Sequence, residues 1–351
     1  MIDFEDGIGS SFRYRKPGLP ADGFLLSRGR DALTIISQEL KSVNSDPQVL
    51  VPAFICDVVP RTLIENGIKV AFYDITPNLE IDLESVGKTF TNNTAAILFV
   101  NYFGFLQPKE KINELARFKV PIIEDNTQAF LSGSVLADVE GVRGWTFTSY
   151  RKLLPVPEGS QLSFIGKNHR FNGELHSPAV NYVTWRLFGL FLKSVALKIP
   201  HYYVESVRQE FFTRSVRSIN FRYPARIAQV SKAFLRHIDI EKVFSSRRAN
   251  YLTLLKGIRD NNACLPIFER LMENICPFGF PVLVKNRNGL LNRLENRKIS
   301  AALLWDRNTM VNALDYPMSS HLWDHILVLP IGQAYSAEDM LRMIQTINEV
   351  L

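Results

Sequence analysis

The first third of the chain switches repeatedly between two patterns of apolar residues. Residues 28–43 place Ala32, Leu33, Ile36 and Leu40 three and four positions apart, which is the spacing of one helix face. Short continuous apolar runs, such as AAILFV at 95–100, are typical of buried strands instead. The two patterns predict helices over 28–43, 57–66 and 108–118, and strands over 48–52, 70–74, 95–100 and 121–124.

Regular alternation of strands and helices implies parallel strands joined by crossover helices, with helices on both faces of the sheet. The α/β class is therefore predicted. Ligands of such sheets bind beyond the carboxyl ends of the strands. Asp125, residues 52–54 and residues 101–104 all follow predicted strands. We expect their loops to converge on one pocket.

The second half of the chain has a different pattern. It is mainly helical from Phe164 to about residue 255, and a small α+β domain is predicted after that. The most apolar stretch, 182–199, is interrupted by charged residues, so a buried or interface helix is expected rather than a membrane-spanning one. A peripheral membrane helix is the alternative. The α+β domain is predicted to contain strands over 280–284, 301–305 and 326–329, and helices over 289–296 and 336–351.

Composition narrows the class of protein. The chain has 351 residues, of which 46% are hydrophobic and 22% charged, and this balance excludes a mostly disordered protein. Its three cysteines are odd in number and widely spaced, which disfavours a disulfide framework and fits a reducing compartment. The first residues lack the apolar core of a signal peptide, so we expect a cytoplasmic protein.

The formal net charge of +6 is unevenly distributed. Residues 161–250 hold 15 Lys and Arg against 5 Asp and Glu. Such a segment could face phosphates, nucleic acid or an anionic membrane, or it could be a solvated helical face. The chain has no recognised nucleic-acid-binding module, and His321 and His325 lack the glutamate of an HExxH zinc motif. Neither a nucleic-acid partner nor a metal site is predicted.

Three residues could carry chemistry, and each has an ordinary alternative. Asp125 could hold a cationic cofactor nitrogen, or it could cap the loop that follows it. Lys152 precedes the stiff apolar segment LLPVP, where loss of water would make its amine nucleophilic; otherwise it is a solvent-facing lysine. Gly29 opens a helix between Arg28 and Arg30, an arrangement that suits a phosphate but also an ordinary turn.

The order and spacing of these pieces, over about residues 24–351, resemble the DegT/DnrJ/StrS family of aminotransferases that use pyridoxal 5'-phosphate (PLP). The resemblance implies fold type I, with a large PLP-binding domain over 1–215 that has a mostly parallel central sheet. It also implies a small C-terminal domain over 216–351. Many members of this family act on nucleotide-linked keto-sugars.

Four residues match the family's contacts to the cofactor phosphate. Gly29 and Arg30, in GRDAL, resemble the Gly-Thr-x-Ala-Leu element, with Arg30 in place of threonine. Ser149, in TSYRK, is similar to the residue that points toward the phosphate. Asn220, in SINFRY, is similar to the asparagine that reaches the phosphate of the partner subunit's cofactor, which implies a homodimer with shared active sites.

Four further residues match the contacts to the cofactor ring. The resemblance makes Lys152 the lysine that bonds the cofactor and Asp125 the partner of the pyridine nitrogen. It places Gln128 near the phenolic oxygen. Cys56 stands where a ring-stacking aromatic residue often lies, with Phe54 as a substitute.

The implied activity is transfer of an amino group from an amino acid, with glutamate as the expected donor, to a keto-sugar. A non-catalytic relative that binds a ligand or regulates is the alternative, and it is motivated by five departures from the family pattern. A related dehydratase is disfavoured, because such members typically have histidine where Lys152 stands. A desulfurase would need a mobile catalytic cysteine. The five departures are Arg30, Cys56, Asn101 in place of His, Ser160 in place of Gly, and Gly332 in place of His.

Overall fold

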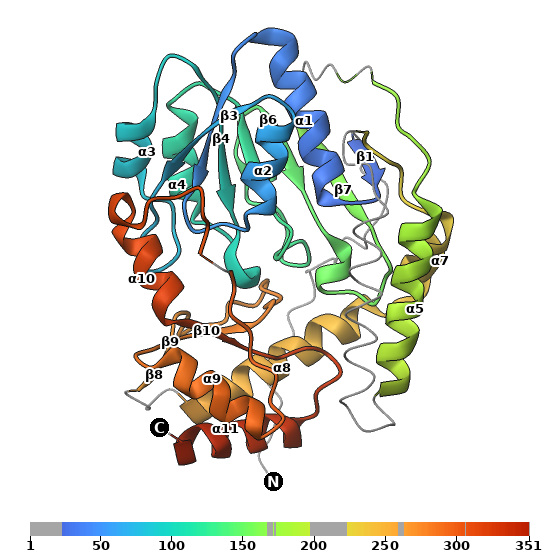
Figure 1. Ribbon diagram of the computed structural model, residues 1–351, viewed down its shortest axis with the longest axis vertical. Helices are drawn as coiled ribbons and strands as arrows, with labels where there is room; N and C mark the ends of the chain where they lie inside the picture. Colours follow the sequence, from blue (N-terminus) through green and yellow to red (C-terminus); the bar gives the residue numbers. More distant parts are fainter. Residues whose placement is uncertain are drawn as a thin grey trace.

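The computed structural model describes residues 23–166, 171, 173–196, 223–258, 263–305 and 307–350. Within these ranges, one sheet of seven strands has the order β1-β7-β6-β5-β4-β2-β3 and is flanked by helices (Figure 1). The four strands predicted in the first third are present as β2, β3, β4 and β5. The strands are β1 (Gly23–Leu26), β2 (Gln48–Pro52), β3 (Lys69–Tyr73), β4 (Thr94–Val100), β5 (Ile122–Asp125), β6 (Gly144–Phe147) and β7 (Ser160–Ile165).

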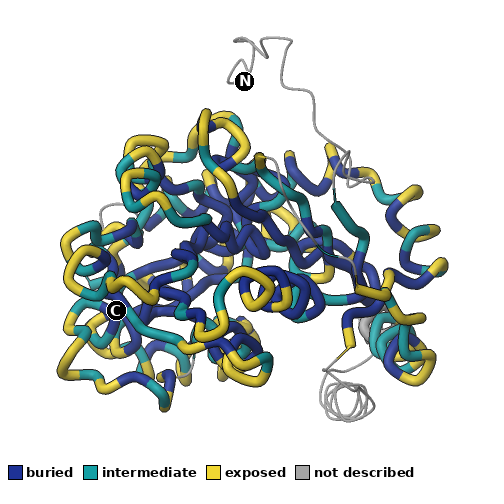
Figure 2. The backbone as a smooth tube through the Cα atoms, turned by 90° about the horizontal axis from the view of Figure 1, so that it is seen from above, coloured by how far each residue is buried: buried dark blue, intermediate teal, exposed yellow. Residues whose placement is uncertain are grey.

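Strands β3, β2, β4, β5 and β6 are parallel, whereas β7 is antiparallel to both β6 and β1. The prediction of a mostly parallel central sheet is confirmed. Figure 2 shows buried residues concentrated in the interior and exposed residues at the periphery, as expected for a sheet covered by helices. The helices of this larger unit are α1 (Gly29–Val43), α2 (Val58–Glu65), α3 (Leu83–Thr89), α4 (Lys109–Ala116), α5 (Val180–Ala196) and α7 (Gln229–His237).

The C-terminal part forms a smaller α+β unit, as predicted, around a three-stranded antiparallel sheet of order β10-β9-β8, whose strand β8 was not predicted. In Figure 1, α8, α9 and α11 gather beside this sheet, below the larger one. The boundary predicted between residues 215 and 216 lies outside the described residues. The elements are β8 (Cys264–Pro266), β9 (Phe280–Val284), β10 (Ile326–Leu329), α8 (Ile240–Ile258), α9 (Arg287–Asn296), α10 (Pro317–His325) and α11 (Ala337–Val350).

The strand predicted over 301–305 is wrong. Only Ala302 pairs with the sheet, through an isolated bridge to Val328 on β10. The chain then leaves the sheet, because Trp305 packs its ring against Phe54 and Tyr102 of the larger unit, with ring centroids 5.4 and 6.2 Å apart. An aromatic contact between the two units therefore replaces the predicted strand.

The two units also meet along their backbones at the turn 102–104. The Phe278 N–H donates to the Phe103 carbonyl oxygen at 2.7 Å, and beside this turn the Cys276 N–H donates to the Ser132 hydroxyl at 2.9 Å. Gly104 has a φ of +96°, and a Cβ there would lie within 3 Å of three backbone atoms of residues 276–278. Only glycine allows this approach.

No helix among the described residues is long and apolar enough to cross a membrane.

Candidate active site

The loops that follow the parallel strands converge, as the sequence predicts. The Tyr102 hydroxyl, after β4, donates to the Phe54 carbonyl oxygen, after β2, at 2.7 Å. The Phe103 N–H donates to the Gln128 side-chain oxygen, after β5, at 2.7 Å. Lys152, which lies in the short helical turn Tyr150–Lys152 after β6, contacts the loop that follows β5. This edge of the sheet therefore brings together the residues that the sequence singled out.

Lys152 is a partly buried amine held by a neighbouring hydroxyl. Its Nζ donates to Thr127 Oγ1 at 2.7 Å. Burial lowers the pKa of Lys152, whereas negative charge on Asp125 or Cys56 acts in the opposite direction. Arg151 adds to the lowering. Lys152 is therefore the desolvated lysine that its sequence context suggested, with a larger neutral fraction than an exposed lysine has.

Asp125 is the last residue of β5 and is buried. Its Oδ1 accepts a hydrogen bond from the Thr127 N–H at 3.0 Å, so it caps its own loop. That bond uses one of about four acceptor positions on a carboxylate. The capping role and a role toward a cationic ligand are therefore compatible.

Asn101 and Gln128 use their amide groups to hold the surrounding loops. Asn101 Nδ2 donates to Glu124 Oε1 at 2.8 Å, while Asn101 Oδ1 accepts from the Gln107 N–H at 2.9 Å. The oxygen of Gln128 binds the turn 102–104 in the bond described above. Asn101 thus has a structural role where the family has histidine, and the expected contact of Gln128 with a cofactor remains a prediction.

The N-terminus of α1 lies against the segment that leads to Lys152. A Cβ at Gly29 would lie 3.5 Å from the Thr148 carbonyl oxygen. At the same helix end, Arg28 binds Asp31 through its guanidinium and through its backbone N–H, the latter at 2.8 Å. The first turn of a helix offers backbone N–H groups and positive potential to an anion. Gly29 therefore lies at a helix N-terminus beside the segment that carries Lys152, and its contact with a phosphate stays a prediction.

Arg30, in the first turn of α1, and Cys56, just before α2, interact electrostatically. Burial lowers the pKa of Arg30, with negative charge on Glu65 and Cys56 acting in the opposite direction. Burial raises the pKa of the Cys56 thiol, and the positive Lys152 opposes this rise. Cys56 therefore lies within electrostatic range of both the α1 terminus and Lys152.

Phe54 cannot substitute for the ring-stacking aromatic residue. It has no exposed surface, and its ring packs against Tyr102 at 5.8 Å and Trp323 at 6.0 Å, as well as against Trp305. The ring is part of the contact between the two units, so it presents no free face to a ligand. The suggested substitution is wrong, because the side chain is needed in the core.

The two remaining phosphate candidates are placed differently. Ser149 is buried and precedes the turn that carries Lys152; its carbonyl oxygen accepts from the Lys152 N–H at 3.2 Å. Asn220 lies outside the described residues, and so does the shared site that it implies.

The smaller unit supports the loop after Lys152. Gln333 Nε2 donates to the Leu153 carbonyl oxygen at 3.0 Å, and Gln333 Oε1 accepts from the Arg247 guanidinium at 2.9 Å. Gly332, where the family has histidine, accepts at its carbonyl oxygen from Asn250 Nδ2 at 3.2 Å. Residues 332–333 therefore connect the smaller unit by hydrogen bonds to the loop that follows Lys152.

Two contributing residues were missed by the sequence analysis, Thr127 and Gln333. A threonine two positions after an aspartate indicates a turn, but it does not reveal a contact with a lysine 25 residues away. For Gln333, which lies 180 residues from Leu153, the sequence offers no signal.

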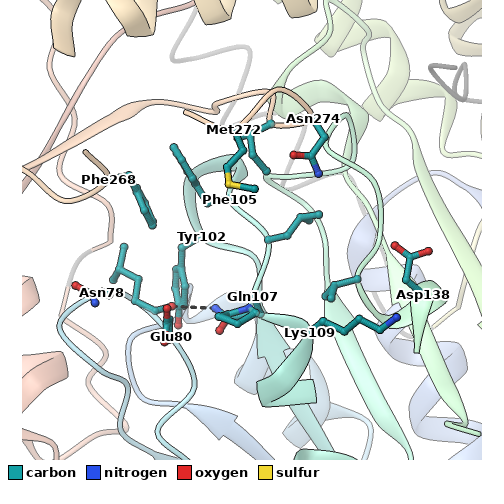
Figure 3. Close-up of a pocket in the computed structure, with 15 residues that line it drawn as sticks. Asn78, Glu80, Tyr102, Phe105, Gln107, Lys109, Asp138, Phe268, Met272 and Asn274 are labelled. Atoms are coloured by element: carbon teal, nitrogen blue, oxygen red, sulfur yellow. Dashed lines mark hydrogen bonds between the residues drawn. The ribbon is translucent and has the colours of Figure 1, made fainter. Parts of the chain in front are cut away.

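A separate cavity of about 490 Å³ lies between the two units, and its labelled side chains are drawn in Figure 3. Phe268 of the smaller unit stacks on Phe105 of the larger unit, with ring centroids 3.8 Å apart, and Met272 and Tyr102 also line the cavity. No residue predicted for cofactor binding lines this cavity.

Among the described residues there is no group of three or more His, Cys, Asp or Glu placed to hold a metal ion.

Comparison with known proteins supports the resemblance. Residues 24–140 match the model of the DegT/DnrJ/EryC1/StrS aminotransferase family. The GDP-4-keto-6-deoxy-D-mannose 3-dehydratase of Escherichia coli O55:H7 is 32% identical over 107 residues, which are 29% of this chain and 27% of that relative. This similarity thus spans about a quarter of that relative's length.

Solved structures match over almost the whole chain. The S. venezuelae protein DesV, in complex with a ketimine intermediate, is 17% identical with a TM-score of 0.68, covering 94% of this chain and 85% of that one. Spr1654 from Streptococcus pneumoniae, named as a sugar aminotransferase and solved in a PLP-form, is 15% identical with a TM-score of 0.67, covering 94% and 88%. At these identities the match establishes the fold. The chain thus shares the fold of these solved structures, and its residues 24–140 match the model of the DegT/DnrJ/EryC1/StrS aminotransferase family.

Proposed function

We propose that the protein is a PLP-dependent aminotransferase that moves an amino group from an amino acid, with glutamate as the expected donor, to a nucleotide-linked keto-sugar. One observation carries the proposal. The desolvated amine of Lys152 is hydrogen-bonded to Thr127, whose N–H binds the carboxylate of Asp125, so amine and carboxylate share one small site. A lysine and a buried acid at the carboxyl ends of neighbouring parallel strands are what this chemistry requires.

The residues present fit PLP. An anionic phosphate needs backbone N–H groups and positive charge, and the α1 N-terminus with Arg30 offers both. Because Gly29 packs on the carbonyl of Thr148, this anion site lies beside the segment that carries Lys152. A cationic ring nitrogen needs a carboxylate, and Asp125 supplies it in a buried position. We propose contributions from Gln128, Ser149 and Cys56 on the basis of the resemblance.

When bound, PLP supplies an electron-accepting ring that stabilises the negative charge left when a substrate carbon loses its proton. The chain would contribute the rest. The lowered pKa of Lys152 would allow its amine to act as a nucleophile, and then to take up and return a proton. Asp125 would keep a proton on the ring nitrogen, and the α1 terminus would fix the orientation of the phosphate.

The sugar class and the oligomeric state rest on different support. The E. coli relative is named for a GDP-linked keto-sugar, which supports a nucleotide-linked substrate here. Lys152 favours transfer over dehydration, because the family's dehydratases typically have histidine at that position. We propose a homodimer on the resemblance of Asn220 alone.

The proposal is tested by trapping the cofactor on the protein. Full-length protein is incubated with PLP and treated with borohydride, which fixes the cofactor on the lysine that binds it. The protein is then digested, and the masses of its peptides are measured by mass spectrometry. We expect one modified lysine, Lys152, and we expect Lys152→Arg to abolish the adduct. Lys88→Arg, at an exposed lysine on α3, is the matched control and should leave the adduct intact.

A second measurement tests the substrates. Production of 2-oxoglutarate from glutamate is followed while a panel of nucleotide-linked keto-sugars is supplied. Turnover with one of them supports the full proposal. An adduct at Lys152 without 2-oxoglutarate would mean that glutamate is not the donor. The absence of any adduct would favour the non-catalytic, ligand-binding alternative.

A further inference from the structure

Thr127 contacts both residues on which the proposed chemistry depends. Its Oγ1 accepts a hydrogen bond from Lys152 Nζ at 2.7 Å, and its backbone N–H donates to Asp125 Oδ1 at 3.0 Å. The residue is buried, with 7% of its surface exposed. Because water has little access to this hydroxyl, its position depends on the backbone of Thr127 and on its protein neighbours.

We propose that Thr127 is a positioning residue that sets the direction of the Lys152 amine relative to the Asp125 carboxylate. The proposal rests on the proposed function, since it assigns Thr127 a role in preparing Lys152 for proton transfer. In this proposal Thr127 touches neither substrate nor cofactor, and it acts only through its hydrogen bond with Lys152 Nζ.

The backbone around Thr127 is rigid. Asp125 pairs with Phe147 across β5 and β6, and just beyond this pair the Asn126 N–H donates to the Phe147 carbonyl oxygen at 2.9 Å. The next residue is Thr127, whose N–H is held by Asp125. The position of the threonine hydroxyl is therefore fixed by the end of the sheet.

A fixed acceptor restricts what the amine can do. A neutral lysine amine has two N–H groups and one lone pair, and rotation about its last bond is otherwise free. Directing one N–H at Thr127 removes the orientations in which the lone pair points at that hydroxyl. The lone pair is then kept for a substrate proton on another side, which is the orientation effect that catalysis requires.

The same bond affects how tightly Lys152 holds its proton. Burial lowers the pKa of Lys152, Asp125 and Cys56 oppose this lowering, and Arg151 adds to it. Thr127 brings an oxygen lone pair to the ammonium form without adding a charge. Loss of that acceptor should therefore lower the pKa of Lys152 further.

A structural role for Thr127 makes a different prediction. If its methyl group only fills space, valine should replace it without effect on Lys152, because the two side chains have nearly the same shape. If the hydroxyl matters, serine should preserve the behaviour of Lys152 and valine should not. The pair Thr127→Val and Thr127→Ser therefore separates packing from positioning.

The test is a titration of Lys152 in the full-length protein after the cofactor has been removed. Trace acetylation with acetic anhydride is measured from pH 6 to pH 11, and the Lys152 peptide is quantified against the exposed Lys88 peptide. We expect Thr127→Val to lower the pKa of Lys152 by about one unit. Thr127→Ser should keep the wild-type value. So should Thr253→Val, which removes a hydroxyl on α8 that binds only its own helix.

The outcomes distinguish the two proposals. An unchanged Lys152 pKa in Thr127→Val, with an unchanged melting temperature, would overturn the positioning role while leaving PLP binding intact. So would a shift of equal size in Thr127→Ser. If Thr127→Val does not fold, Thr127→Ala takes its place with the same expected shift. A wild-type protein that forms no borohydride adduct would overturn the proposed function, and this is measured independently of the titration.

Discussion

Replacing Glu158 with glutamine should change how the stability of the protein depends on pH. The Glu158 side chain has no exposed surface, and its Oε1 accepts from the Ala228 N–H, at the start of α7, at 2.8 Å. Burial raises the pKa of Glu158 from its ordinary value of 4.5 to about 7, while the bond from Ala228 opposes the rise. The folded protein therefore keeps a proton that the unfolded chain releases.

The sign and size of the effect follow from this difference. Between pH 4.5 and about pH 7 the folded state binds more protons at Glu158, so stability is fully present below pH 4.5 and is lost as the pH rises through 7. The two pKa values correspond to about 3 kcal/mol of unfolding free energy over this window. Glutamine resembles the neutral acid in shape, keeps an oxygen for the Ala228 N–H, and does not titrate.

The assay is urea unfolding of the cofactor-free protein at intervals from pH 4.5 to pH 8. The stability of Glu158→Gln minus that of the wild type should rise by about 3 kcal/mol across this range and then level off. Glu140→Gln, at an exposed loop position, should follow the wild-type curve. If the difference between Glu158→Gln and the wild type stays flat within about 0.5 kcal/mol, the assignment of a neutral buried acid is refuted.

Three further predictions concern single side chains. Asp125→Asn should lower kcat about 100-fold, because an amide cannot hold the charge opposite a cationic ring, and the rate of glutamate conversion measures this. Arg30→Ala should weaken PLP binding about tenfold, as measured by absorbance titration with the exposed Arg61→Ala as control. Asp74→Ala should cost about 3 kcal/mol in urea unfolding, because that carboxylate accepts from two backbone N–H groups and a hydroxyl at the start of α10. The half-buried helix cap Asp82→Ala should cost only about 1 kcal/mol; equal losses for the two aspartates would contradict the reasoning.

The sequence predicted well those parts of the molecule that depend on local pattern. The strand predicted over 121–124 is present as β5 (Ile122–Asp125), and Asp125 is the last residue of that strand. For Lys152 the stiff apolar segment after it left desolvation as one of two alternatives, and the burial of Leu153 and Leu154 agrees with that alternative. Both features depend on residues adjacent in the chain.

The convergence of the strand-end loops was predictable, but the individual side-chain contacts between distant segments were not. Thr127 meets Lys152 only because β5 and β6 are neighbours, and Gln333 reaches the loop after Lys152 from the other unit. The 301–305 segment has the composition of a strand, yet the aromatic contacts of Trp305 draw it away from the sheet. The role of Asn101 likewise depends on a buried carboxylate, Glu124, that only the folded chain brings within reach.

The contact at Gly104 makes the C-terminal unit inseparable from the rest of the chain. Main-chain atoms of 276–278 contact the turn 102–104 directly, and no side chain lies between them whose substitution could adjust the contact. A fragment ending before residue 276 would leave the Phe103 carbonyl oxygen without its donor and would uncover the turn that Gln128 holds. The two units should therefore melt in a single step.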